Sequence, residues 1–351
     1  MIHKHTIESP APNAPAAAGS LAIAGSLPIA DSLPTAEGLV FRPLCVDDVD
    51  AWLELIKRIA AFEKAPSYTQ HSVLLASFSD TVNPVRDNSI VGIDGHGELR
   101  AFGRVLKNRA GEKAYVLGGV DPLWQRRGVG TAVLAWQESV VAARFLADGQ
   151  FPVKARNYVE EDNPALQALL AGTGYSVVRY YSEMLRALEQ LPAVPTPVGI
   201  SIVPLTPQLS EAVRVAHNDA FVDHWGSEPR SPEQWEIFMS HEHLRTELSA
   251  VAIDSLNGAV AGYQLASVDP GKQAQNGRRE GYTELLGVPR RWRGRGIAPA
   301  LLSDAMARFA AAGLDHASLD VDTENPTGAS RLYKDMGYSP QRQSMAWEKL
   351  L

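Results

Sequence analysis

The sequence predicts a mixed α/β protein in which one type of domain occurs twice. The chain has 351 residues, which is roughly the length of two ordinary domains. Residues 189–199 contain three prolines within six residues, which excludes a helix or a central strand there and indicates a linker. The segments on either side, 39–188 and 200–351, align at a constant offset of 168 residues through the turn that follows Val120 and Val288. We therefore expect two tandem domains of one fold.

Each segment has the same predicted order of elements. A helix comes first, followed by a pair of alternating strands, a strand rich in Val, Leu and Tyr, an arginine- and glycine-rich turn, and an Ala/Leu-periodic helix. A further strand, a shorter helix and a terminal strand close the domain. The expected elements cover residues 49–62, 88–105, 114–120, 131–145 and 152–185 in the first segment, and residues 209–221, 249–267, 282–288, 300–312 and 317–348 in the second. This order predicts a mixed sheet covered by helices.

Residues 1–38 differ from both segments in composition. They are rich in Ala, Pro, Ser and Gly, and they contain an imperfect six-residue repeat. A segment with so few periodic apolar residues does not build a core, so we expect a disordered tail. A targeting or docking segment is the alternative.

The composition limits the classes of partner and compartment. Apolar residues make up 45% and charged residues 21%, as in soluble globular proteins. The single cysteine, Cys45, cannot form an internal disulfide, and the sequence has no leader or long apolar run, so we expect a cytoplasmic protein. The formal net charge of −7 argues against nucleic acid or an anionic membrane as the main partner. We expect a small-molecule substrate, with any phosphate site confined to a local basic cluster.

The turn after the third strand is such a cluster. A glycine-rich turn between a strand and a helix presents backbone N–H groups and the positive end of the helix dipole, which together bind anions. Arginines crowd this turn in both segments, so a diphosphate is the natural ligand. Neither turn has the Gly-Lys-Ser/Thr of a P-loop, and Val133 replaces the third glycine of a dinucleotide-binding fingerprint. Both turns do fit the pattern Gln/Arg-x-x-Gly-x-Gly/Ala, starting at Gln125 and Arg293.

With this turn, and with the Asn…Gly-Tyr segments that end at Tyr175 and Tyr338, both halves resemble GCN5-related N-acetyltransferase (GNAT) domains over residues 39–351. The resemblance implies a mixed sheet whose central strands splay to admit the pantetheine of acetyl-CoA, with the diphosphate held at the turn. The tandem arrangement is also similar to the mycothiol synthase type of double-domain acetyltransferase. The residues that the resemblance assigns to acetyl-CoA are Leu286, Val288, Arg293, Gly294, Arg295, Gly296, Ile297, Ala298 and Asn325 in the second half, and Val120, Gln125, Arg126, Arg127, Gly128, Val129 and Gly130 in the first.

The resemblance also implies a tyrosine that protonates the departing thiolate. Tyr333, five residues before Tyr338, takes this role, whereas Leu170 stands five residues before Tyr175 and cannot donate a proton. The spacing from Asn325 to Tyr333 is one residue longer than usual in the family. A core tyrosine that packs the helix onto the sheet is the alternative for Tyr333.

The candidate general base is Glu284. It precedes Leu286 by two residues, which places both side chains on one face of a regular strand, and burial there would raise the pKa of the carboxyl group. The offset of 168 gives Val116 as its counterpart in the first half. An edge carboxylate paired with Arg278 or Arg279 is the alternative. We therefore expect a catalytic second domain and a degenerate first domain with a structural or regulatory role.

The segment after the first helix of the second domain is expected to bind the acceptor. Carboxylates between aromatic side chains suit a cationic amine. The candidate residues are Asp223, His224, Trp225 and Glu228. The spacings nearby match no zinc signature, so no metal is expected.

These features predict an acetyl-CoA-dependent N-acetyltransferase that acts on the primary amine of a small molecule by direct attack. Acetylation of a cysteinyl-aminosugar, as in mycothiol synthases, and a non-catalytic acyl-CoA-binding module are the alternatives.

Overall fold

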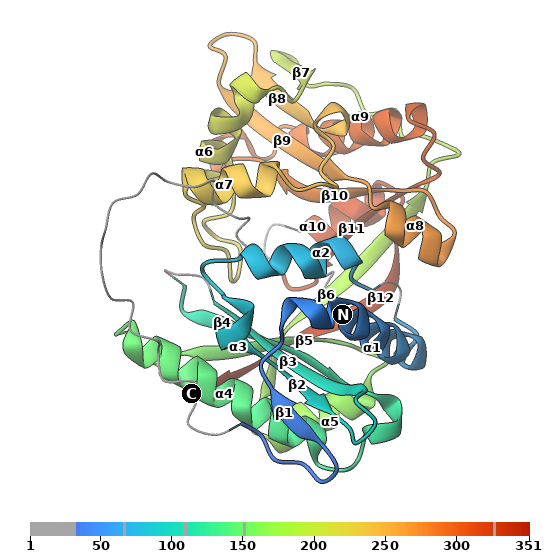
Figure 1. Cartoon of the computed structure of the whole chain (residues 1–351). Helices are drawn as coiled ribbons and strands as arrows, with labels where there is room; N and C mark the ends of the chain where they lie inside the picture. Colours follow the sequence, from blue (N-terminus) through green and yellow to red (C-terminus); the bar gives the residue numbers. More distant parts are fainter. Residues whose placement is uncertain (1–32, 66–67, 108–110, 150–151, 326–327) are drawn as a thin grey trace. The chain divides into compact units, whose positions relative to one another are not determined.

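The protein forms two compact units in a computed structural model that describes residues 33–65, 68–107, 111–149, 152–325 and 328–351 (Figure 1). The first unit comprises Met1–Val178 with Met345–Leu351, and the second comprises Arg179–Ser344. The predicted tail lies outside the described residues up to position 32. Among the described residues, no helix has both the length and the apolar character that crossing a bilayer requires.

The first unit is a mixed sheet with helices on both faces. Its strands follow the order β1-β2-β3-β4-β5 and end with the last residues of β12; β4 and β5 are parallel, whereas β1 to β4 form antiparallel pairs. The strands are β1 (Val40–Arg42), β2 (Ser89–Ile93), β3 (Leu99–Lys107), β4 (Lys113–Val120), β5 (Lys154–Glu160) and β12 (Ser339–Leu350), and the helices are α1 (Val49–Glu63), α2 (His71–Ala76), α3 (Val85–Asn88), α4 (Val129–Ala147) and α5 (Pro164–Gly172). One apolar cluster lies beneath α4 and a second beneath α1.

The second unit repeats this arrangement. Its strands follow the order β12-β6-β11-β10-β9-β8-β7, with β10 and β11 parallel. The strands are β6 (Ser176–Ala187), β7 (Ile200–Pro204), β8 (Ala250–Asp254), β9 (Val260–Ser267), β10 (Glu280–Gly287) and β11 (His316–Asp322), and the helices are α6 (Ser210–Ala220), α7 (Pro232–Met239), α8 (Pro270–Asn276), α9 (Ile297–Ala311) and α10 (Ala329–Asp335). Helices α6 and α7 pack on one face of the sheet, and α9 and α10 pack on the other.

The unit boundaries differ from the predicted domains 39–188 and 200–351. The second part of β6, which we expected to close the first domain, pairs with β11 in the second unit. Residues 345–351, expected to close the second domain, lie in the first unit, where the Leu351 N–H donates to the Val153 carbonyl at 2.9 Å. Both strands are twelve residues long. Each half thus supplies a strand to the sheet built mainly by the other half.

A histidine is buried in the core beneath α6. His217 is 2% exposed, and its Nδ1 lies 2.6 Å from the hydroxyl oxygen of Tyr263 on β9. Burial lowers the pKa of His217 to about 3, whereas the unfolded chain has an ordinary histidine pKa of about 6.5. The folded state therefore keeps the ring neutral in a pH range where the unfolded state binds a proton.

We expect this difference to make the second unit less stable in acid. Between pH 6.5 and 3 the unfolded state binds more protons at His217, so stability falls as the pH drops, by up to about 1.4 kcal/mol per pH unit. Urea unfolding at a series of pH values, with His217→Gln as the non-titrating control, measures this contribution. The wild type should lose more stability than the variant over this range, and parallel curves would contradict the assignment.

Candidate active site

The two parallel strands at the centre of the second unit separate along their length. Pairing between β10 and β11 runs only from Glu280 opposite His316 to Tyr282 opposite Ser318. Both strands continue beyond this point, β10 to Gly287 and β11 to Asp322. Because no further β10–β11 pair forms among the described residues, the carboxyl-terminal parts of the strands leave an opening in the sheet.

Glu284 lies on this opening as an extra residue in β10. Thr283 pairs with Ala266 of β9 and Leu285 pairs with the adjacent Leu265, so Glu284 is an extra residue in the ladder and forms a β-bulge. Bulges re-aim side chains and are over-represented next to active sites. The bulge therefore changes the direction in which the Glu284 carboxylate points from β10, the strand that borders the opening.

The first unit has no residue equivalent to Glu284. Its strand β4 pairs with β3 without interruption over seven residue pairs, from Lys107 opposite Ala114 to Ala101 opposite Val120. Counted from the last parallel pair of each unit, Val116 corresponds to Thr283. The offset of 168 had assigned Val116 to Glu284, and the inserted residue corrects that assignment.

The bulge also changes the face on which Glu284 lies. Leu285 packs in the core beneath α6 and α7, whereas Leu286 packs in the cores on the α9 side. The Ser267 hydroxyl donates to Glu284 Oε1 at 2.6 Å, and Ser267 shares the face of Leu265 by the alternation of β9. Glu284 therefore faces the α6 side, opposite to Leu286 and contrary to the expectation for a regular strand.

The two arginines considered as partners of Glu284 have other partners. Arg278 Nε donates to Glu280 at 2.7 Å, and Arg279 Nε donates to Asp315 at 3.3 Å.

The same face of the sheet carries a cluster of polar side chains that sequence reasoning missed. The Tyr282 hydroxyl donates to Asp320 Oδ2 at 3.2 Å. Lys272 of α8 lies 3.1 Å from Glu183 and 3.0 Å from Glu280. Burial alone would lower the pKa of Lys272, but the two carboxylates raise it above its ordinary value. The alternation of polar and apolar residues along 316–322 was the signal that could have identified this face.

The predicted acceptor-binding segment is only partly directed toward this face. Asp223 instead accepts from Arg290 Nε at 2.7 Å, and Arg293 Nη1 lies 3.7 Å from it, so its carboxylate holds the turn before α9. The Trp225 ring lies 5.2 Å from the guanidinium of Arg179, which donates to Asp322 at 3.1 Å.

The other two residues of this segment are partly buried. Burial lowers the pKa of His224, and the charge of Asp322 opposes that shift. Glu228 lies in the connection between α6 and α7. His224 and Trp225 are thus close enough to the end of β11 to border the opening.

The turn before α9 has the backbone of an anion-binding loop. Gly294 has φ +74° and Gly296, the N-cap of α9, has φ +79°. In the first unit Arg126 and Gly128 take the same left-handed conformation at the equivalent positions, with φ +62° and +78°. The first-turn N–H groups of each helix have no intrahelical acceptor, and they belong to Ile297 and Ala298 in α9 and to Val129 and Gly130 in α4. Both turns therefore fit a diphosphate.

The arginines of this turn have different surroundings from those expected. Arg293 Nε donates to the Val288 carbonyl at 3.1 Å, and its Nη2 donates to the Ala220 carbonyl at 2.8 Å. Arg293 thus links the turn to the residue after β10 and to the last residue of α6. Arg295 and Arg127 each lie over a tryptophan ring of their own turn, and Gln125 ends the short helix before Gly128.

Tyr333 lies on α10, which packs on the face of the sheet opposite to the one that Glu284 faces. It is 8% exposed, packs in the core beneath α9, and meets Tyr338 edge-on with ring centroids 6.0 Å apart. Burial raises the pKa of Tyr333 to about 12, so its hydroxyl keeps its proton at neutral pH. In the first unit the apolar Leu170 is fully buried at the matching place.

The two asparagines of the repeated segment have different roles. Asn163 is the N-cap of α5, and its side chain accepts from the Leu166 N–H at 3.1 Å. Helix α10 begins four residues after Asn325, with Gly328 as its N-cap. Gly328 therefore takes the N-cap position in α10 that Asn163 holds in α5.

The first unit has one side-chain bond between its two parallel strands that the second unit lacks. Pairing of β4 with β5 also stops after three residues, at Tyr115 opposite Arg156. Beyond that point Asn157 Nδ2 donates to the Val116 carbonyl at 2.7 Å, and the Tyr115 and Tyr158 rings stack 6.2 Å apart. In the second unit Tyr282 makes the corresponding connection to Asp320, but Leu319 packs in the core at the position where Asn157 makes its bond in the first unit.

Comparisons with known proteins agree with this architecture. Residues 211–338 match the acetyltransferase (GNAT) family. The solved GCN5-related N-acetyltransferase from Sphaerobacter thermophilus superimposes with a TM-score of 0.74 and 26% identity, over 91% of this chain and 97% of that chain. The second half of the chain therefore carries a GNAT acetyltransferase domain. A tandem GNAT protein from the clavulanic acid biosynthesis pathway shares the fold, with a TM-score of 0.66 and 20% identity over 89% of this chain and 98% of that chain.

The chain is also similar to mycothiol acetyltransferases. The protein of that name from Clavibacter michiganensis subsp. michiganensis is 27% identical over 80% of this chain and 84% of the relative. The one from Corynebacterium aurimucosum is 26% identical over 78% of this chain and 91% of the relative. The predicted tandem GNAT fold and acetyltransferase class are confirmed.

Proposed function

We propose that this GNAT acetyltransferase transfers the acetyl group of acetyl-CoA to the primary amine of a small molecule, and that the second unit carries out the reaction. The observation that carries the proposal is the opening between β10 and β11, with the Glu284 bulge on the strand that borders it and Tyr333 on the opposite face of the sheet. The first unit has neither residue, and Asn157 adds a bond to the Val116 carbonyl beyond the last parallel pair. Its role in the proposal is structural or regulatory.

The residues around the opening have different roles in the proposed reaction. Acetyl-CoA supplies an activated thioester. Glu284 takes a proton from the ammonium of the acceptor, because only the neutral amine attacks a carbonyl carbon. Backbone groups of Leu286 and Val288 hold the thioester oxygen. As the C–N bond forms and the C–S bond breaks, Tyr333 gives its proton to the departing sulfur. The nitrogen releases its second proton, which restores the phenol, and Glu284 passes its own proton to solvent.

The turn at 293–298 holds the diphosphate of the donor in this proposal. An aspartate at position 296 brings a negative charge to that site. Gly128→Asp is the matched control, because Gly128 has the same left-handed conformation at the start of α4.

We expect the wild-type chain to bind one acetyl-CoA, the Gly296→Asp variant to bind none, and the Gly128→Asp variant to bind like the wild type. Calorimetric titration of acetyl-CoA measures affinity and stoichiometry together. A stoichiometry of two would assign donor binding to the first unit as well, and no binding to the wild type would overturn the donor.

The polar face around Glu284 supports a cationic acceptor. Glu183, Glu280 and Asp320 lie on it, together with Lys272. Carboxylates favour an ammonium group, and hydroxyl-rich molecules find hydrogen-bond partners among the same side chains.

A second candidate for the acceptor is the cysteinyl-aminosugar acetylated in mycothiol formation, which the names of the two curated relatives favour. A thiol-release assay that compares simple primary amines with a cysteinyl-aminosugar distinguishes the two candidates. Turnover of the cysteinyl compound at a far higher kcat/KM would select the second.

A further inference from the structure

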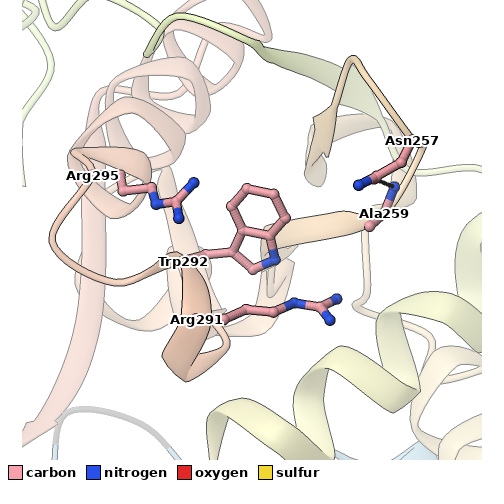
Figure 2. Close-up of a pocket in the computed structure, with 5 residues that line it drawn as sticks. All are labelled: Asn257, Ala259, Arg291, Trp292 and Arg295. Carbon is pink, nitrogen blue, oxygen red and sulfur yellow. Dashed lines mark hydrogen bonds between the residues drawn. The ribbon is translucent and has the colours of Figure 1, made fainter.

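Arg104 is a buried arginine of the first unit whose side chain forms no ion pair or hydrogen bond with any residue that the structure describes. It lies on β3 and is 6% exposed. Unpaired arginines at a surface are ordinary, because water solvates their charge; Arg291 and Arg295, beside a small pocket of the second unit, are exposed in this way (Figure 2). Arginines are almost never buried unless they are paired, because an enclosed charge without a counter-charge destabilises the fold. The burial of Arg104 therefore calls for an explanation.

Asp80 is the carboxylate whose charge acts on Arg104. Burial lowers the pKa of Arg104 to about 10, and the charge of Asp80 only partly opposes that shift. The oxygens of Asp80 have other partners: Oδ1 accepts from the N–H groups of Val82 and Asn83 at 2.8 Å. Oδ2 accepts from Asn83 Nδ2 at 3.3 Å. Asp80 thus acts from a distance, and within the described part of the chain no anion contacts the guanidinium of Arg104.

The second unit shows that the fold does not require an arginine at this position. Counted along the antiparallel ladders from the corresponding residues of β4 and β10, Leu265 of β9 takes the place that Arg104 has in β3. Leu265 is fully buried in the apolar cluster beneath α6 and α7. An aliphatic side chain therefore fills the same place without burying a charge, so packing alone does not account for Arg104.

The sheet face that carries Arg104 is partly open on the neighbouring strand. Side chains alternate along β3, so Arg104 shares the face of Phe102, which packs beneath α1. Leu117 lies opposite Arg104 on β4 and is only partly buried, as is Tyr115 two residues before it. The ring of Tyr115 stacks on that of Tyr158, with the centroids 6.2 Å apart. Apolar and aromatic side chains that remain partly accessible therefore extend from the buried guanidinium.

The charge and the surroundings of Arg104 together select a class of ligand. Nε and Nη2 are enclosed without partners, so a ligand meets the guanidinium through Nη1. One carboxylate balances one guanidinium, whereas a phosphate dianion would leave a second negative charge buried near Asp80. We propose that the first unit binds a small monocarboxylate with an apolar or aromatic body, its carboxylate at Arg104 and its body against Leu117 and Tyr115. This site is independent of the reaction proposed for the second unit.

Titration of the full chain with acetate, hexanoate and phenylacetate tests the proposal. The side-chain Nε–H resonance of Arg104, assigned with the Arg104→Leu variant, is followed by NMR during each titration. We expect a saturable shift with phenylacetate at a lower concentration than with acetate, and no shift with the uncharged phenylacetamide. If none of the three carboxylates moves the resonance, the proposal is overturned. A response to inorganic phosphate as strong as that to phenylacetate would overturn the assignment to monocarboxylates.

Urea unfolding distinguishes a ligand site from a structural arginine. Arg104→Leu copies the second unit, so without ligand it should unfold at the same urea concentration as the wild type or a higher one. Phenylacetate should raise the midpoint of the wild type but not of this variant, whose Kd by calorimetry should be about 10- to 100-fold weaker. Arg86→Leu, the same change at an exposed position of α3, should bind phenylacetate like the wild type. A lower midpoint in Arg104→Leu with unchanged binding would show that Arg104 serves folding alone, and would overturn the proposal.

Discussion

The Tyr333→Phe variant is expected to bind acetyl-CoA as tightly as the wild type and to turn over about 10²- to 10⁴-fold more slowly, the range that general acid catalysis contributes. The substitution removes one hydroxyl and keeps the ring that packs in the core beneath α9. The pKa of Tyr333 is raised to about 12, so the hydroxyl is a proton donor throughout the usual assay range. Steady-state kinetics with a thiol-release readout, together with calorimetric titration of the donor, separates turnover from binding.

Tyr338→Phe is the matched control for this prediction. Tyr338 lies in the same cluster and meets Tyr333 edge-on, and its hydroxyl has no hydrogen-bond partner in the described structure. Loss of that hydroxyl should leave turnover close to wild type. Unchanged turnover in Tyr333→Phe would show that this residue packs the core and does not donate a proton. Equal losses in both variants would point to packing rather than proton transfer.

The local features of the site could be predicted from the sequence because they depend on neighbouring residues. Gly294 and Gly296 supply the left-handed conformations that the turn needs, and an Ala/Leu-periodic helix follows them directly. The repeat then assigned the same turn to the first unit, where Arg126 takes a positive φ that only the comparison with Gly294 would suggest. Such signals were sufficient for the tandem GNAT fold.

The features that the sequence did not reveal depend on partners far along the chain. Strand exchange places residues 345–351 in the first unit, and nothing in the pattern of either half specifies a partner in the other. Asp223 pairs with Arg290, sixty-seven positions away, so composition alone suggested a free carboxylate. The bulge at Glu284 depends on the register with β9. An alignment of the two halves that is fixed at the turn does not reveal a one-residue insertion earlier in the strand.

The bulge leads to the second large effect: replacing Glu284 by Gln is expected to lower kcat/KM about 10²- to 10⁴-fold near neutral pH. The variant keeps the extra residue in β10 and a side-chain oxygen that can accept from Ser267, as Glu284 does at 2.6 Å. What it loses is the ability to take a proton from the acceptor. Raising the pH deprotonates the amine without help from the enzyme, so the defect should shrink steadily toward the pKa of the acceptor. A loss that stays constant with pH would indicate a structural or binding role.

Deleting Glu284 tests the bulge itself. The deletion gives β10 the uninterrupted register that β4 already has in the first unit, where the residues from Ala114 to Val120 pair with β3 in sequence. We therefore expect the deletion variant to fold, as judged by circular dichroism and cooperative urea unfolding, and to lose activity at every pH. High pH should rescue the Gln variant but not the deletion, because the deletion also removes the kink that re-aims the strand beside the opening. Wild-type turnover in the folded deletion variant would show that the extra residue is not what distinguishes the catalytic unit from the first one.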